Sequence, residues 1–125
     1  MRIFLPLVFA LVSMSAAAQA QPVGTFNIEG RNPNAASGPP TYTGTLTITS
    51  EGDSYSVVWL VGAARIRVEG RGLYQNGMFS VAYNNVNPPG PAIVVYVRRR
   101  NQWVGRWSIP GTPGIGTETL TPVGR

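Results

Sequence analysis

The chain has 125 residues, of which 43% are hydrophobic and only 12% charged, and its formal net charge at pH 7 is +5. Its basic residues are all arginines, and it contains neither cysteine nor histidine. These absences exclude disulfides, a lipid-modified cysteine, thiol catalysis and the common zinc sites, and they remove histidine as a general base. The many glycines, prolines, threonines and valines are typical of a compact β protein.

The N-terminus has the pattern of a secretory signal peptide over residues 1–20. A positive start is followed by an apolar run at residues 3–14 and then by small residues. Ala18-Gln19-Ala20 has the small-x-small form after which signal peptidase cleaves. The apolar run is shorter than the roughly 20 residues that cross a bilayer, which disfavours a retained anchor. We therefore expect export to the periplasm or the medium, with residues 21–125 forming one domain without a membrane anchor.

Short segments of alternating polar and apolar residues, separated by turn residues, follow along the rest of the chain. The clearest lies around Leu46 and Ile48, which share one face while threonines occupy the other. No helical periodicity is visible after the leader. This pattern predicts eight strands, at residues 23–30, 42–49, 54–61, 65–72, 78–84, 92–98, 102–109 and 115–121.

Eight consecutive strands with short links favour an all-β, up-and-down antiparallel β-barrel with an avidin- or lipocalin-like architecture. Closing the sheet removes exposed edges, which matters in an exported chain without disulfides. The interior of an eight-stranded barrel is either filled by side chains or holds one small ligand. A two-sheet β-sandwich is the alternative, and the hairpin-like links favour the barrel.

The links between the predicted strands differ at the two ends of the barrel. Links after the second, fourth and sixth strands are tight, whereas long links rich in proline and glycine follow the first, fifth and seventh strands, at residues 32–40, 85–91 and 110–114. In a meander these long links share one end. That end is the better candidate for a binding site, because binding residues often lie in loops on a rigid scaffold. The alternative is that the loops only connect strands.

No catalytic group of residues is visible in the sequence. A hydroxyl nucleophile needs a base, and both histidine and lysine are missing. Glu51 and Asp53 fall in a predicted tight turn, while Glu29 and Glu69 are expected to face outward beside arginines as surface ion pairs. We therefore expect a protein that is not an enzyme and that has no metal site and no cofactor.

The aromatic residues suggest a ligand pocket inside the barrel. The hypothesis assigns ligand contacts to five of them, namely Trp59, Tyr83, Tyr96, Trp103 and Trp107. Gly44, Gly70 and Gly105 fall on inward positions, where they leave room beside the rings or allow the strands to bend. The alternative is that the rings only fill a small core.

Arg98, Arg99 and Arg100 form the single concentrated run of charge, at the predicted tight-turn end. We interpret them as a candidate surface for anionic lipids, glycans or acidic proteins. An exported protein meets these before nucleic acid, so no nucleic-acid partner is expected. The alternative is a solvated turn, because neighbouring residues of a strand alternate between its faces.

Several segments together resemble a family of small exported bacterial all-β proteins, some of which are labelled fibronectin-binding. The segments are Gly44 to Thr49, Asp53 to Trp59, Val94-Val95-Tyr96, Gly105-Arg106-Trp107 and Gly116 to Thr121. The resemblance implies export and an all-β fold, and no catalytic motif accompanies it. It also implies a surface or matrix partner as an alternative function.

The function predicted from the sequence is that of an exported, non-enzymatic binding protein. Its partner is either a small apolar ligand inside the barrel or a macromolecule at the long-loop end. The alternatives are a fibronectin-type surface or matrix interaction protein and a secreted enzyme inhibitor.

Overall fold

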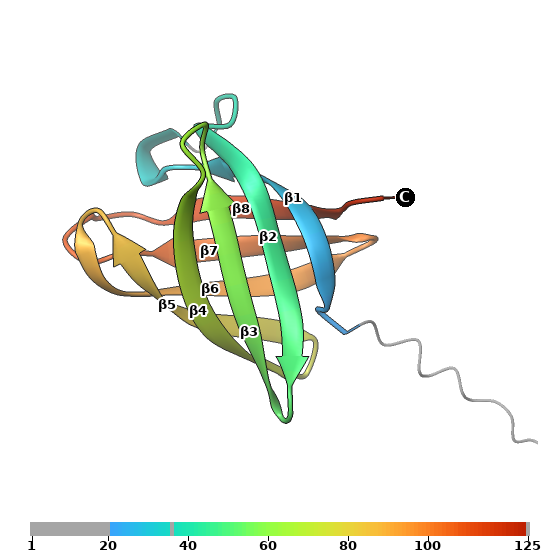
Figure 1. The fold of residues 1–125 in the computed structure, drawn as a ribbon. Coiled ribbons are helices and arrows are strands. Elements are labelled where there is room, and N and C mark those ends of the chain that lie inside the picture. Colours follow the sequence, from blue (N-terminus) through green and yellow to red (C-terminus); the bar gives the residue numbers. More distant parts are fainter. Residues whose placement is uncertain (1–20, 36, 125) are drawn as a thin grey trace, which may run out of the picture.

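The computed structural model describes residues 21–35 and 37–124, which form a closed antiparallel barrel (Figure 1). Each strand pairs with the next and the last with the first, so the predicted up-and-down barrel is confirmed and the sandwich alternative is wrong. The strands are β1 (Gly24–Arg31), β2 (Tyr42–Glu51), β3 (Ser54–Val61), β4 (Ile66–Gln75), β5 (Met78–Val86), β6 (Pro89–Arg99), β7 (Gln102–Ser108) and β8 (Gly116–Pro122).

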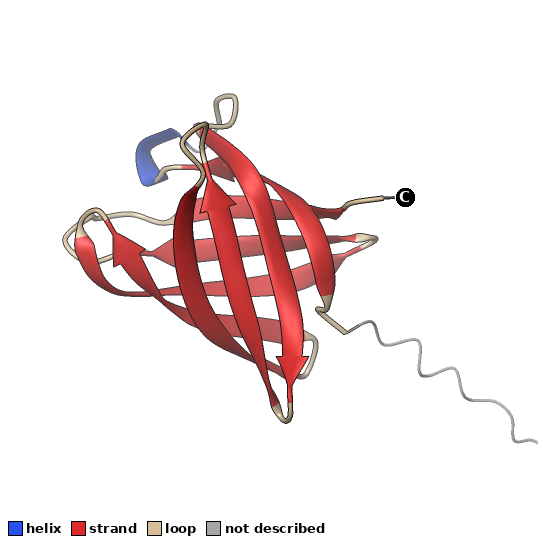
Figure 2. Ribbon diagram, viewed as in Figure 1, coloured by secondary structure: helices blue, strands red, loops and turns tan. Residues whose placement is uncertain are grey.

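Little else is regular structure (Figure 2). The short 3₁₀ helix η2 (Pro33–Ala35), which the sequence pattern did not predict, lies in the link between β1 and β2. The predicted signal peptide at residues 1–20 lies outside the described residues. Within the described part of the chain, no helix is long and apolar enough to cross a membrane.

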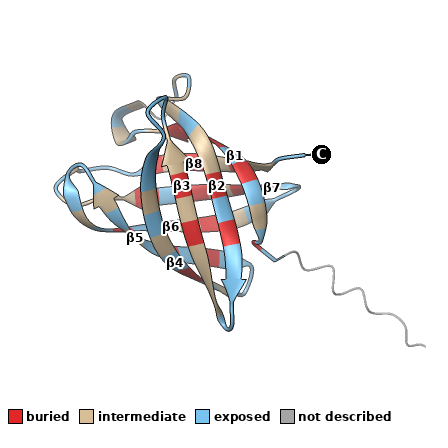
Figure 3. Cartoon of the chain, viewed as in Figure 1, coloured by how far each residue is buried: buried red, intermediate tan, exposed pale blue. Residues whose placement is uncertain are grey.

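The alternation predicted from the sequence sets which side chains face the interior (Figure 3). In β2, Leu46 and Ile48 are buried while Thr47 between them is exposed. In β7, Trp103 and Trp107 are buried on the same face, on either side of Gly105. This two-residue period is the geometric property of a pleated strand, and it carries apolar side chains inward from all eight strands.

The two ends of the barrel differ as the sequence predicts. Tight turns join β2 to β3, β4 to β5 and β6 to β7 at one end, toward the lower right of Figure 1. Asn76 and Gly77 both have positive φ, 55° and 79°, as in the turns that suit the twist of a two-residue hairpin. Links after the odd-numbered strands lie at the opposite end, which we call the open end.

One predicted loop is wrong. Residues 85–91 are not a long link, because β5 continues to Val86 and β6 already begins at Pro89. The prolines fit a strand here because β6 extends beyond its last pair with β7, Ile93 with Ser108, and therefore has only one neighbouring strand. Two long links, not three, thus surround the open end, between β1 and β2 and between β7 and β8.

The tight-turn half of the barrel is solidly packed. Phe79 meets Tyr55 edge to face at 5.4 Å between ring centroids and stacks on Tyr96 at 6.2 Å. Pro22, just before β1, is fully buried, and Gln21 accepts a 2.5 Å hydrogen bond from the Tyr55 hydroxyl. Burying each large side chain here stabilises the fold by roughly 1.5–3 kcal/mol. Phe79 and Tyr96 belong to one core cluster that also includes Trp59, Val94 and Trp107 of the other half.

Candidate functional site

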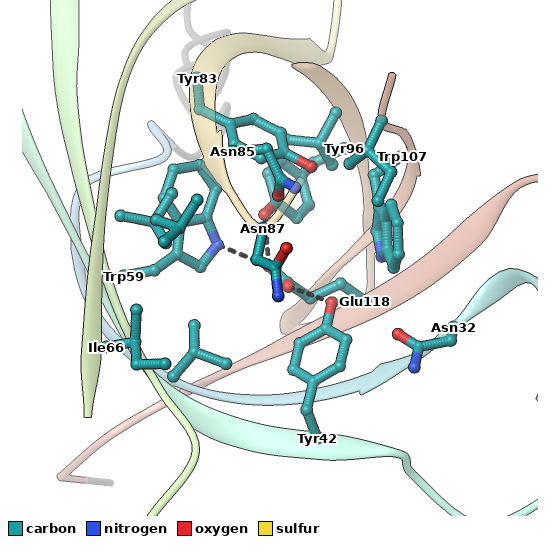
Figure 4. A pocket seen from close by; sticks show the side chains of 15 residues that line it. Asn32, Tyr42, Trp59, Ile66, Tyr83, Asn85, Asn87, Tyr96, Trp107 and Glu118 are labelled. Carbon is teal, nitrogen blue, oxygen red and sulfur yellow. Dashed lines mark hydrogen bonds between the residues drawn. The ribbon is translucent and has the colours of Figure 1, made fainter. Parts of the chain in front are cut away.

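The open half of the barrel contains a cavity of about 310 Å³ (Figure 4). This volume is at the small end of the range of ligand pockets, about 300–1,000 Å³. Its walls are mostly apolar and aromatic, and they come from β2 to β8 and the neighbouring links. The lining residues are Asn32, Tyr42, Trp59, Val61, Ile66, Val68, Tyr83, Asn85, Val86, Asn87, Val94, Tyr96, Trp107, Ile109 and Glu118.

A buried carboxyl group, that of Glu118, lies among the rings that line the cavity. Only 4% of the residue is exposed, and it is the one buried charged residue in the described part of the chain. Three side chains donate hydrogen bonds to it. The Tyr42 hydroxyl donates to Oε1 at 2.7 Å, and Trp59 Nε1 and the Tyr96 hydroxyl donate to Oε2 at 3.0 and 2.5 Å. Donors from β2, β3 and β6 thus converge on one residue of β8.

The alternation of β8 places Glu118 inside. Gly116, Glu118 and Leu120 are buried, and the threonines between them are only partly buried. Gly116 has a specific role, because a Cβ there would lie 2.1 Å from the Trp107 ring. The absence of a side chain therefore lets the Trp107 indole lie against β8, where Nε1 donates a 3.3 Å hydrogen bond to the Thr117 carbonyl.

Burial controls the protonation of this site. It raises the pKa of the Glu118 carboxyl above its usual value of 4.5, and the hydrogen bonds from Tyr96, Tyr42 and Trp59 offset only part of that shift. Burial, together with the nearby Glu118, also raises the pKa of the hydroxyls of Tyr42, Tyr83 and Tyr96, so these remain neutral donors. Among the described residues, none of the cavity-lining side chains is basic.

Stability should therefore depend on pH through Glu118. A carboxyl with a raised folded-state pKa contributes stability that is complete below its unfolded pKa and is lost as the pH rises through the folded value. We expect the free energy of unfolding of the wild type, relative to Glu118→Gln, to fall as the pH rises from 4.5, by at most about 1.4 kcal/mol per pH unit. Urea denaturation of both proteins over a pH series measures this difference in the free energy of unfolding.

The matched control for this pH series is Glu29→Gln, which removes the same charge from an exposed position of β1. This variant should follow the pH profile of the wild type. Identical profiles for Glu118→Gln and the wild type would contradict the assignment.

Four of the five predicted ligand-contact residues lie together around the cavity: Trp59, Tyr83, Tyr96 and Trp107. Trp59 and Tyr83 are in contact, with ring centroids 5.0 Å apart. Trp103 faces the interior too, but it lies in the packed half against Tyr74, at 6.0 Å and edge to face. Residues four apart along a strand are separated by about 13 Å, so Trp107 and Trp103 belong to opposite halves.

The three arginines at residues 98–100 lie at the tight-turn end, on the exposed surface and away from the cavity. Arg98 lies over the Trp103 ring at 5.6 Å, and its Nε donates a 2.6 Å hydrogen bond to the Arg100 carbonyl. Its side chain is thereby held against the barrel, while Arg99 and Arg100 are exposed. Contact with an anionic surface stays a prediction.

The predicted roles of the other acids can be compared directly. Glu69 forms the expected surface ion pair, with Arg67 at 2.6 Å, whereas Glu29, although exposed, forms none among the described residues. Glu51, expected only as a turn residue, pairs with Arg71 at 2.9 Å on the exposed surface. Glu118 is the buried cavity residue that the sequence reasoning missed. A signal was present, since Glu118 alternates with threonines and shares a strand face with Leu120.

Comparison with protein-family models and with curated protein sequences gives no match. Solved structures with similar folds include a point mutant of the fluorescent protein UnaG, with a TM-score of 0.53 and 13% identity over 83% of this chain and 97% of that one. The REP1-NXSQ fatty acid transporter has a TM-score of 0.52 and 10% identity over 82% and 96%. At these identities the similarity concerns the fold alone, and it agrees with the small closed β-barrel expected from the sequence.

Proposed function

We propose that this protein is an exported, non-enzymatic binding protein that holds a small, largely apolar ligand in the cavity at the open end of the barrel. One observation supports this proposal above others: an apolar cavity of about 310 Å³ lies in the open half of the barrel, with the buried Glu118 carboxyl in its wall. An apolar cavity with a few polar groups that converge on one point is the usual form of a small-molecule site.

The polar groups of the cavity suit binding better than catalysis. Glu118 already accepts three hydrogen bonds from neutral donors, which orient its carboxyl group. The sequence offers no histidine, cysteine or lysine to act as a base or nucleophile beside it. The similarity to a fatty acid transporter also favours a small-molecule ligand, as an analogy of architecture.

Filling the cavity should weaken binding. Val68 lines the cavity, so Val68→Phe is expected to lower the affinity for the neutral apolar dye N-phenyl-1-naphthylamine at least about tenfold, by excluding it sterically. Titration with dye fluorescence measures the change. The matched control is Val58→Phe, because Val58 is partly exposed on the face of β3 opposite to Trp59. Equal affinities for both variants and the wild type would place the dye outside the cavity.

Export, a fibronectin-type surface or matrix interaction, and enzyme inhibition stay predictions of the sequence. The two long links at the open end are the segments that a macromolecular partner would meet first. Small-molecule binding is preferred because the cavity, unlike these links, carries a buried polar group with a defined geometry.

A further inference from the structure

The Glu118 carboxylate has acceptor capacity left. Each carboxylate oxygen can accept about two hydrogen bonds. From the described residues, Oε2 accepts two hydrogen bonds, from Trp59 and Tyr96, whereas Oε1 accepts one, from Tyr42. Because Glu118 lines the cavity, the remaining position on Oε1 is available to a donor carried by a ligand.

The rings around this carboxyl add a second feature that favours a cation. Figure 4 shows Tyr42, Trp59, Tyr83 and Trp107 on different sides of the cavity with Glu118 among them. The faces of tryptophan and tyrosine rings attract cations within about 6 Å, most strongly where water is excluded. The carboxyl group and the aromatic rings thus both favour a positive charge on a ligand.

The alternative head groups fit this cavity less well. A ligand carboxylate would lie beside Glu118 with no basic side chain among the described lining residues to neutralise either acid, and two close carboxylates repel. A wholly apolar ligand would cover Glu118 and leave its ionised form without a counter-charge. A protonated amine can donate a hydrogen bond to the remaining position on Oε1, and its positive charge neutralises the Glu118 carboxylate.

We infer that the ligand is an organic cation, a protonated amine on a compact apolar body, and that Glu118 is its counter-charge within the aromatic cavity. This inference rests on the proposed small-molecule binding function and names the class of ligand. It assigns Glu118 as the specificity-determining residue and the rings of Tyr42, Trp59, Tyr83 and Trp107 as the walls that contact the cation.

The test uses three probes with the same apolar body: 4-phenylbutylamine, 4-phenylbutan-1-ol and 4-phenylbutanoate. Titration calorimetry at pH 8 should show the amine binding roughly ten- to a hundredfold more tightly than the alcohol, as expected for a hydrogen bond to a charged group. The carboxylate should bind most weakly. Glu118→Gln should remove the preference for the amine, and Glu29→Gln, which changes an exposed acid, should keep it.

A second measurement does not need any variant to fold. In the wild type, the affinity for the amine should fall as the pH is lowered through the pKa of Glu118, while the affinity for the alcohol should stay constant. The other titratable groups that face this carboxyl are the hydroxyls of Tyr42, Tyr83 and Tyr96, whose raised pKa values keep them neutral over this range.

The outcomes separate this inference from the proposed function. An alcohol or carboxylate that binds as tightly as the amine would overturn the inference while leaving small-molecule binding intact. Binding of N-phenyl-1-naphthylamine without any binding of the amine would do the same. If neither the dye nor any of the three probes binds, the proposed function itself fails.

Discussion

Replacing Glu118 with alanine is expected to lower the free energy of unfolding by roughly 3–5 kcal/mol. The substitution leaves the Tyr42 and Tyr96 hydroxyls and the Trp59 indole N–H without their acceptor. Each buried polar group that loses its partner costs about 1–3 kcal/mol. Since domains of this size are stable by only about 5–15 kcal/mol, this loss is a large share of the total stability. Urea denaturation monitored by tryptophan fluorescence measures the loss.

The source of this loss can be isolated with a double variant. Combining Glu118→Ala with Tyr96→Phe removes both the acceptor and a donor whose hydroxyl lies 2.5 Å away. The double variant should therefore be less destabilised than the sum of the two single variants. Glu29→Ala, at an exposed position, should change stability by less than about 0.5 kcal/mol. If the stability losses of Glu118→Ala and Tyr96→Phe simply add in the double variant, the hydrogen-bond network centred on Glu118 is contradicted.

Most of the fold was predictable because it depends on local patterns. The strand predicted at residues 54–61 has the same bounds in the structure, and the others differ by three residues at most. Alternation identified the inner faces, as Trp103 and Trp107 with Gly105 between them illustrate. The number of strands and the turn residues between them then favoured closure of the sheet, because an open sheet leaves edges exposed.

The site itself was only partly predictable, because it depends on register around the barrel. The donors to Glu118 lie 76, 59 and 22 residues away along the chain, at Tyr42, Trp59 and Tyr96. Which of the inward residues of eight strands meet at one level depends on how the strands are staggered, and a single sequence does not show that stagger. For the same reason, Trp103 was grouped with rings that lie in the other half.

Proline was the other source of error. The prolines of residues 85–91 predicted a loop, since proline lacks an N–H group for a sheet. In the structure, Pro88 lies in the turn before β6, and Pro89 and Pro91 lie where β6 has a single neighbour. The prediction of a long loop was therefore wrong, because β6 extends beyond β7 and there has only one partner.

Replacing Gly44, the one glycine of β2, with alanine is expected to lower the free energy of unfolding by roughly 3 kcal/mol, at the upper end of the range for overpacked sites. A Cβ at this position would lie 2.1 Å from the Leu60 carbonyl oxygen. This neighbour is backbone, so no change of rotamer relieves the overlap and β2 must move away from β3. Thermal and urea denaturation measure the effect.

The matched control for Gly44→Ala is Gly38→Ala, where the nearest atom to a new Cβ is 4.0 Å away and stability should change by less than about 0.5 kcal/mol. Equal stability of both variants would mean that the two strands can separate at little cost. Tyr42 lies two residues before Gly44 on the same inner face and donates to Glu118 Oε1. A shift of β2 would therefore withdraw that hydroxyl, so Gly44→Ala should weaken binding in the cavity as well as the fold.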